Sequence, residues 1–167
     1  MHLLSHIHPR SYVHTQQSSL DISERVPFLM LAMDLPPAPL YKDALEKNII
    51  PQVPIFDIIS KYDGQLVTDD VRTGRQRYQL TRLPRFLLLH VRRFKKNNFF
   101  MEKNPTIVNF PVKNLDLAAA LPVPRGADGQ PAPAKYDLVA NVVHEGKAGG
   151  GAYKCHIHRA VEDVWYV

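Results

Sequence analysis

The chain has 167 residues, 45% of them apolar, with 21 Lys and Arg against 16 Asp and Glu, which gives a formal net charge of +5. That length and apolar fraction are typical of one globular domain and argue against a wholly disordered chain. No apolar run approaches the about 20 residues that a membrane span needs. The single cysteine, Cys155, excludes an internal disulfide and a Cys-rich zinc module, and favours a reducing compartment.

The first 25 residues differ from the rest in composition. They are polar, rich in His, Ser and Gln, and follow neither a helical nor a strand period. We therefore expect residues 1–25 to form a disordered or non-homologous lead-in. His2, His6 and His8 lie close together in this segment, but it offers no acidic or cysteine partner, so we expect no metal site there.

The next segments indicate a strand, a proline-rich turn and one short helix. Residues 26–35 form an apolar run that ends in a cluster of prolines, which is typical of a strand entering a rigid turn. In the segment 55–62 the apolar residues are spaced i, i+3, i+4 and i+7, which predicts one buried face of a short helix. The residues of that face are Ile55, Ile58, Ile59 and Tyr62.

From residue 77 onward the pattern is mostly β. Residues 86–91 are apolar without alternation, which predicts a central strand buried on both faces. Residues 121–134 contain several prolines and glycines and predict a long loop. The other predicted strands are 77–81, 107–111, 136–143, 153–158 and 164–167.

Basic residues are concentrated in one part of the chain. Residues 72–103 hold ten Lys and Arg against a single acid, a net charge of +9, whereas the remainder carries −4. Such a block fits an anionic partner, either RNA or an acidic protein, and the alternative is a solvated face without a partner. We expect Phe94 to lie in the core. For Arg93 the alternative to partner binding is a structural ion pair within the chain. The candidate partner-binding residues are Arg92, Arg93, Lys95, Lys96, Phe99, Phe100 and Lys103.

Three motifs, in this order and spacing, resemble the ubiquitin-specific protease family. Residues 83–94 read L-P-R-F-L-L-L-H-V-R-R-F, residues 136–146 read Y-D-L-V-A-N-V-V-H-E-G, and G-A-Y at 151–153 precedes W-Y at 165–166. The runs 35–43, 49–54 and above all 96–111 are similar to the branch of that family found in the spliceosomal tri-snRNP.

The resemblance implies an α+β fold of the papain-like cysteine protease superfamily, mainly antiparallel β with one or two short helices. It implies that residues 26–167 are the C-terminal part of a ubiquitin-specific protease domain. Such a partial domain would lack the N-terminal half that carries the catalytic Cys box, and the extreme C-terminus.

The resemblance also implies that the catalytic groups are missing. A thiol protease needs a thiolate, an imidazole base and a group that orients the imidazole. Ala152 stands at the family's histidine position, no Cys box precedes it, and Cys155 lies at the wrong place in the motif. His144 matches the family's non-catalytic His-x-Gly position.

His156 and His158 share a strand face without a third ligand, and paired CxxC motifs are absent, so neither a metal nor a cofactor is expected.

The sequence therefore predicts a catalytically inactive protease-like scaffold. By resemblance it would act in pre-mRNA splicing in the nucleus, in assembly or stability of the tri-snRNP, with tri-snRNP proteins as partners and RNA as a further candidate. Two alternatives stay open. One is an active deubiquitinase whose catalytic groups lie in sequence outside this chain, and the other is a ubiquitin-binding module that does not cleave.

Overall fold

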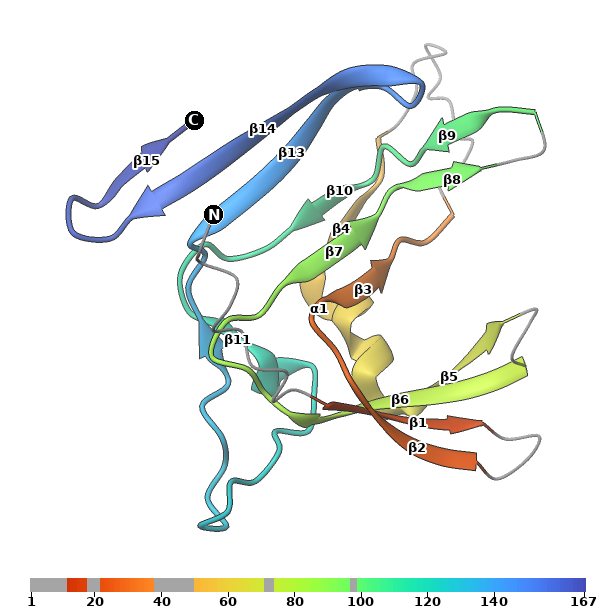
Figure 1. Cartoon of the computed structure of the whole chain (residues 1–167), viewed down its shortest axis with the longest axis vertical. Coiled ribbons are helices and arrows are strands. Elements are labelled where there is room, and N and C mark those ends of the chain that lie inside the picture. Colours follow the sequence, from red (N-terminus) through yellow and green to blue (C-terminus); the bar gives the residue numbers. More distant parts are fainter. Residues whose placement is uncertain (1–11, 18–21, 38–49, 71–73, 97–98) are drawn as a thin grey trace.

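The computed structural model describes residues 12–17, 22–37, 50–70, 74–96 and 99–167 (Figure 1). Strands predominate in these ranges, and most of the strand pairs are antiparallel. This agrees with the predicted mainly antiparallel α+β architecture with short helices. Among the described residues no helix is both long and apolar enough to cross a membrane.

One antiparallel sheet has the strand order β2-β1-β6-β5, and its members are β1 (Tyr12–Gln17), β2 (Ile22–Pro27), β5 (Asp63–Asp70) and β6 (Gly74–Arg82). The predicted strand 77–81 is thereby confirmed and is longer than expected. The expectation of a lead-in without regular structure is wrong for residues 12–17 and 22–25. Their polar sequence shows no strand period, and they are ordered because β1 pairs with β6, more than 50 positions further along the chain. Residues 1–11 and 18–21 lie outside the described part.

The predicted helix is present as α1 (Ile55–Ile59), which continues as the 3₁₀ turn η1 (Ser60–Tyr62). All four residues of its predicted apolar face are buried, which confirms that face. The Tyr62 hydroxyl donates a hydrogen bond of 2.8 Å to the carbonyl of Ala32, and burial raises the pKa of Tyr62 to about 12. The core around this face contains Leu31, Met33, Val53, Leu80, Leu117, Leu121 and Ala134.

Two short parallel strand pairs contribute residues to the core. β3 (Leu31–Asp34) pairs with β7 (Leu89–Arg92), and β4 (Gln52–Pro54) pairs with β10 (Ile107–Asn109). The predicted strand 26–35 is interrupted by a bend at residues 29–30, and the predicted strand 107–111 is confirmed over its first three residues.

The prediction of a buried central strand over 86–91 is wrong in part. β7 begins only at Leu89, and the Phe86 side chain is 58% exposed. β7 is short because its partner strand β3 has only four residues, and these pair with residues 89–92. The segment before β7 is held differently, by a 2.7 Å hydrogen bond from the Tyr136 hydroxyl to the Pro84 carbonyl.

The predicted strand 136–143 is divided into two elements. β12 (Lys135–Tyr136) pairs with β11 (Leu115–Asp116), and β13 (Ala140–Lys147) belongs to another sheet. The Asp116 carboxylate accepts a 3.0 Å hydrogen bond from the Ala118 amide at the start of the 3₁₀ turn η2 (Leu117–Ala119). The predicted loop 121–134 contains no helix or strand, only the isolated bridge between Arg125 and Pro131.

The last sheet has the antiparallel order β13-β14-β15, and its hairpin lies beside a second, smaller hairpin. β14 (Gly150–Arg159) and β15 (Val164–Tyr166) confirm the predicted strands 153–158 and 164–167. β8 (Phe94–Lys96) and β9 (Met101–Lys103) form the smaller hairpin, whose β9 strand reaches the turn between β13 and β14 (Figure 1).

A polar clasp closes the turn between β14 and β15. The Asp163 carboxylate lies 2.9 Å from His158 Nε2 and 3.4 Å from Lys113 Nζ. The hydrogen bond with His158, followed by the charge of Lys113, lowers the pKa of Asp163 below its ordinary value of 3.8. His158 also stacks on Trp165, with ring centroids 5.0 Å apart.

We expect this clasp to respond to acid. Because the pKa of Asp163 is lowered by folding, its stabilising effect is present above pH 3.8 and is lost as the pH falls through the lower value of the folded state. Trp165 is the only tryptophan of the chain, so its fluorescence should change in that range. Asp163→Asn, which tolerates the positive φ of 51° at this position, should abolish the change. The same acid transition in both proteins would contradict the assignment.

Candidate functional site

The position that the family motif assigns to the catalytic base lies on β14. Ala152 is exposed there and pairs with Glu145 of β13. The Glu145 carboxylate is occupied, since it lies 2.9 Å from the Lys154 ammonium. A methyl group cannot accept a proton, so the side chain at 152 supplies no base.

Cys155 is exposed on the same strand, opposite Val142. Side chains alternate between the two faces of a strand, and residues 152 and 155 are three positions apart. The thiol and the side chain at 152 therefore lie on opposite faces of the sheet. A histidine placed at 152 would project from the wrong face to activate this thiol.

His144 lies opposite Tyr153 and packs between two aromatic rings. The ring centroids are 5.0 Å from Phe94 and 4.9 Å from Tyr153. Its Nδ1 atom is buried and has no hydrogen-bond partner among the described residues, so no group orients the imidazole as a triad would. In the part of the chain that the structure describes, no group of three His, Cys, Asp or Glu side chains could hold a metal ion.

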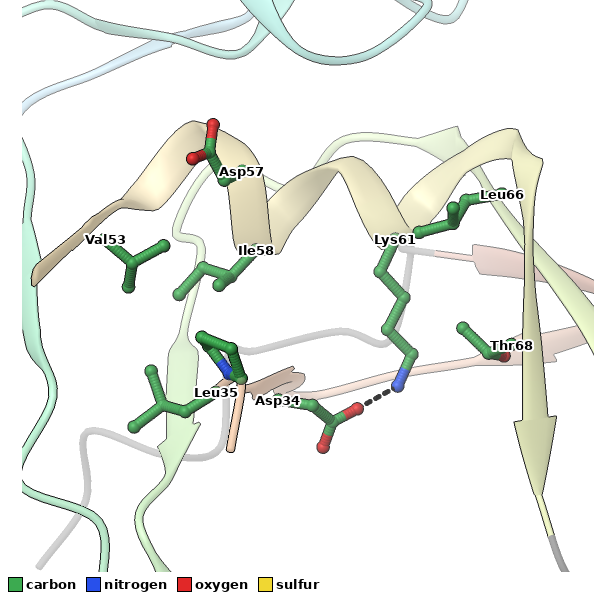
Figure 2. A pocket seen from close by; sticks show the side chains of 9 residues that line it. Asp34, Leu35, Val53, Asp57, Ile58, Lys61, Leu66 and Thr68 are labelled. Atoms are coloured by element: carbon green, nitrogen blue, oxygen red, sulfur yellow. Dashed lines mark hydrogen bonds and ion pairs between the residues drawn. The ribbon is translucent and has the colours of Figure 1, made fainter. Parts of the chain in front are cut away.

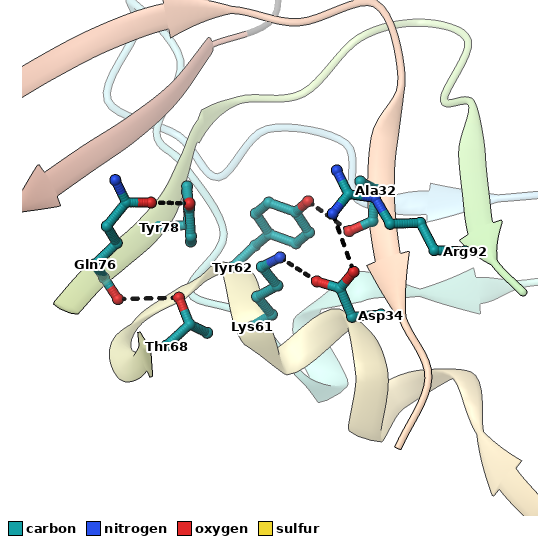
Figure 3. Close-up of polar contacts among 8 residues, drawn as sticks. All are labelled: Ala32, Asp34, Lys61, Tyr62, Thr68, Gln76, Tyr78 and Arg92. Atoms are coloured by element: carbon teal, nitrogen blue, oxygen red, sulfur yellow. Dashed lines mark hydrogen bonds and ion pairs between the residues drawn. The ribbon is translucent and has the colours of Figure 1, made fainter. Parts of the chain in front are cut away.

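Three of the seven candidate partner-binding residues are engaged within the chain, and Arg92 is the first. Its guanidinium lies 3.2 Å from the Asp34 carboxylate, which also forms an ion pair with Lys61 (Figure 3). The pair joins the ends of β7 and β3. Arg92 is therefore partly neutralised before any partner arrives.

Arg93 has an internal role. It donates hydrogen bonds to the carbonyls of Thr106 and, at 3.2 Å, Asn104, and burial lowers its pKa. The alternative of a structural ion pair is thus replaced by hydrogen bonds to backbone carbonyls. These bonds fix the connection between β9 and β10 to the start of β8.

We expect Arg93→Met to destabilise the protein. The change removes both charge-assisted hydrogen bonds and keeps most of the aliphatic chain, so the free energy of unfolding should fall by about 1.5–3 kcal/mol. Urea denaturation measures this loss. Lys95→Met is the matched control, because the Lys95 side chain is exposed on β8, and its effect should stay below about 0.5 kcal/mol. Equal effects of the two changes would refute the internal role.

Lys103 is the third engaged residue. Its ammonium donates hydrogen bonds of 2.9 Å to the His144 carbonyl and 3.1 Å to the Gly146 carbonyl. Since these carbonyls belong to β13, Lys103 fastens the β8–β9 hairpin to the β13–β14 turn. Figure 1 shows the two hairpins side by side at this point.

The other four candidates remain on the surface. Lys95 and Lys96 are exposed on β8, and Phe99 and Phe100 are 93% and 58% exposed. Sequence reasoning missed Met101, which is 44% exposed beside them. Phe94 was expected in the core but is 38% exposed on β8, where its ring packs edge-on against the His144 ring.

A cavity of about 460 Å³ lies elsewhere, between α1, β3 and β5 (Figure 2). Its walls are mostly apolar, and the ion pair between Asp34 and Lys61 borders it. None of the predicted site residues lines it, and no sequence signal pointed to it. Its lining residues are Asp34, Leu35, Pro36, Val53, Asp57, Ile58, Lys61, Leu66 and Thr68.

Comparison with known sequences identifies similar proteins. The family model described as ubiquitin carboxyl-terminal hydrolase matches residues 5–167. Human "Ubiquitin carboxyl-terminal hydrolase 39" is 46% identical over 143 residues, which are 83% of this chain and 25% of that protein. "Probable mRNA-splicing protein ubp10" of Schizosaccharomyces pombe is 42% identical over 120 residues, 72% of this chain and 24% of that protein. The chain thus spans about a quarter of the length of these relatives.

Solved structures with a similar fold include the crystal structure of an essential yeast splicing factor. It superposes with a TM-score of 0.63 and 25% identity, over 93% of this chain and 34% of that chain. The SAGA DUB module superposes with a TM-score of 0.60 over 93% of this chain and 30% of that chain. Its identity is 16%, so this second likeness concerns the fold alone.

Proposed function

Because the chain belongs to the ubiquitin carboxyl-terminal hydrolase family, we propose that it is a catalytically inactive member that acts in pre-mRNA splicing. In this proposal it is a nuclear scaffold that helps to assemble or stabilise the tri-snRNP through contacts with tri-snRNP proteins. The fold is the α+β, papain-like fold of ubiquitin-specific proteases. The family match begins at residue 5, so the proposed partial domain includes the β1–β2 hairpin as well as residues 26–167.

The splicing assignment is supported by similarity to proteins named for that process. The fission yeast relative carries mRNA splicing in its name, and the yeast structure is that of a splicing factor. Both similarities extend over most of this chain, 72% for the first and 93% for the second.

One observation carries the proposal of inactivity, namely the alanine at position 152. Acyl transfer by a thiol needs a base that takes the proton and later returns it. Ala152 offers no such group, and Cys155 lies on the opposite sheet face. In this proposal the sheet of the protease is kept while the chemistry that it positions in active enzymes is lost.

Sedimentation of nuclear extract tests the splicing role. Full-length tagged protein should migrate through a glycerol gradient with the intact tri-snRNP and should leave those fractions when the particle is dissociated by salt. Migration as free protein, beside intact particles, would contradict the role.

A ubiquitin titration tests the rival in which the chain binds ubiquitin without cleaving it. We expect millimolar ubiquitin to leave the amide chemical shifts of the isotopically labelled protein unchanged. Saturable shifts on β13 and β14 would favour the ubiquitin-binding module.

A further inference from the structure

We propose that the exposed end of the β8–β9 hairpin binds an acidic protein segment that carries large apolar side chains. We call this end the hairpin surface and define it by Lys95, Lys96, Phe99, Phe100 and Met101. The inference rests on the proposed function, since the segment would belong to a protein of the tri-snRNP. RNA is the competing occupant, and the charges and apolar side chains of the surface distinguish the two.

Few cations of the hairpin region are available to phosphates. Arg92 is paired with Asp34, Arg93 binds two backbone carbonyls, and Lys103 binds two more. Lys95 and Lys96 remain exposed on β8, and none of the ion pairs among the described residues involves them. Proteins that hold nucleic acid by its backbone commonly neutralise several phosphates along a basic groove. Lys95 lies opposite Glu102 and Lys96 lies opposite Met101, so the two lysines project from opposite faces of the hairpin. Two separated charges are too few for a row of phosphates, and each suits a single carboxylate instead.

Apolar side chains make up the rest of the hairpin surface. Phe99, Phe100 and Met101 are 93%, 58% and 44% exposed, although they are adjacent in sequence. Phenylalanine and methionine are enriched where protein interfaces are most buried, and large aromatic side chains supply a disproportionate share of binding energy there. Exposed contiguous groups of this kind mark interaction sites on soluble proteins.

The hairpin is held in place before it meets a partner. Lys103 fastens β9 to the β13–β14 turn, and the Phe94 ring packs edge-on against His144. In the hairpin register Lys96 pairs with Met101 and Phe94 pairs with Lys103, so these four side chains share one face. A partner that contacts Met101 therefore meets the Lys96 ammonium beside it, on a support that loses little conformational freedom on binding.

Binding of the fluorescently labelled full chain to purified tri-snRNP, and to the RNA extracted from the same particles, tests the inference. Phe99→Ser/Phe100→Ser should weaken particle binding by roughly tenfold or more, and Lys95→Glu/Lys96→Glu by roughly threefold to tenfold. Val161→Ser, which replaces a residue as exposed as Phe99, controls for the loss of surface apolar area. Arg77→Glu/Arg82→Glu makes the same charge reversal on β6 and should leave binding unchanged.

The outcomes separate the inference from the function on which it rests. The expected result is particle binding that depends on the two phenylalanines, weak dependence on salt, and no binding to the extracted RNA. Equal binding to the extracted RNA would make RNA the occupant and overturn the inference. Particle binding that all four variants retain would also overturn it and leave the splicing role intact. Absence of particle binding by the unchanged chain would contradict the splicing role itself.

Discussion

Gly151→Ala should destabilise the protein by about 3 kcal/mol or more, because no space exists for a methyl group at this position. A Cβ atom added to Gly151 would lie 2.1 Å from the Glu145 carbonyl oxygen and 2.7 Å from His144 Nε2. The first of these atoms is backbone of the neighbouring strand and cannot move without breaking the pairing of β13 with β14. The same shift would pull the His144 and Gly146 carbonyls away from Lys103.

The neighbouring glycines provide matched controls. Alanine at position 149 or 150 would meet no atom within 4 Å, so Gly149→Ala and Gly150→Ala should change the free energy of unfolding by less than about 0.5 kcal/mol. Urea denaturation of the three variants measures the difference. A Gly151→Ala protein as stable as the two controls would show that the turn is looser than described.

Met33→Ala should cost about 2–5 kcal/mol of unfolding free energy. Met33 lies on β3, is 0% exposed and belongs to the core that α1 covers. Its removal leaves a cavity between β3, β7 and α1, and the flanking Ala32 and Asp34 are held by pairing with β7 and cannot close it. The loss should be visible as a lower urea midpoint with an unchanged slope.

Met30→Ala is the control for this change. Met30 is only three positions away, at a bend, and is 50% exposed. The same truncation there creates no cavity, so its effect should stay within about 0.5 kcal/mol. If both methionines gave the same small effect, the described core would be wrong at β3.

Local patterns in the sequence predicted the elements that local interactions determine. The helix over 55–62 was predicted because its four apolar residues repeat at the helical period, and all four are buried. Residues 12–17 and 22–25 were not predicted as strands because their polar sequence has no period. They form strands because β1 pairs with β6, more than 50 positions further along the chain, and no local sequence pattern shows such a pairing. The overlong prediction at 86–91 has the same origin, since the partner β3 limits the strand.

The family motifs identified the fold and predict that the base is missing, whereas the contact surface could be predicted only in part. The count of basic residues over 72–103 treated every cation as available. Arg92 and Asp34 are 58 positions apart, and Lys103 and the His144 carbonyl are 41 positions apart. No local pattern shows such pairings, so a sequence cannot separate the two available lysines from the three engaged cations. The exposure of Met101 could not be predicted either, because it depends on the β8–β9 hairpin in which this residue lies.

Hydrolysis of a fluorogenic ubiquitin substrate by the full-length protein tests the central claim most directly. With an active ubiquitin-specific protease as positive control, we expect a rate equal to that of buffer, and no covalent adduct with ubiquitin that carries a C-terminal electrophile. Turnover above buffer that is lost on mutation of a cysteine of the protein would contradict the account. It would show that another group replaces the base absent at Ala152.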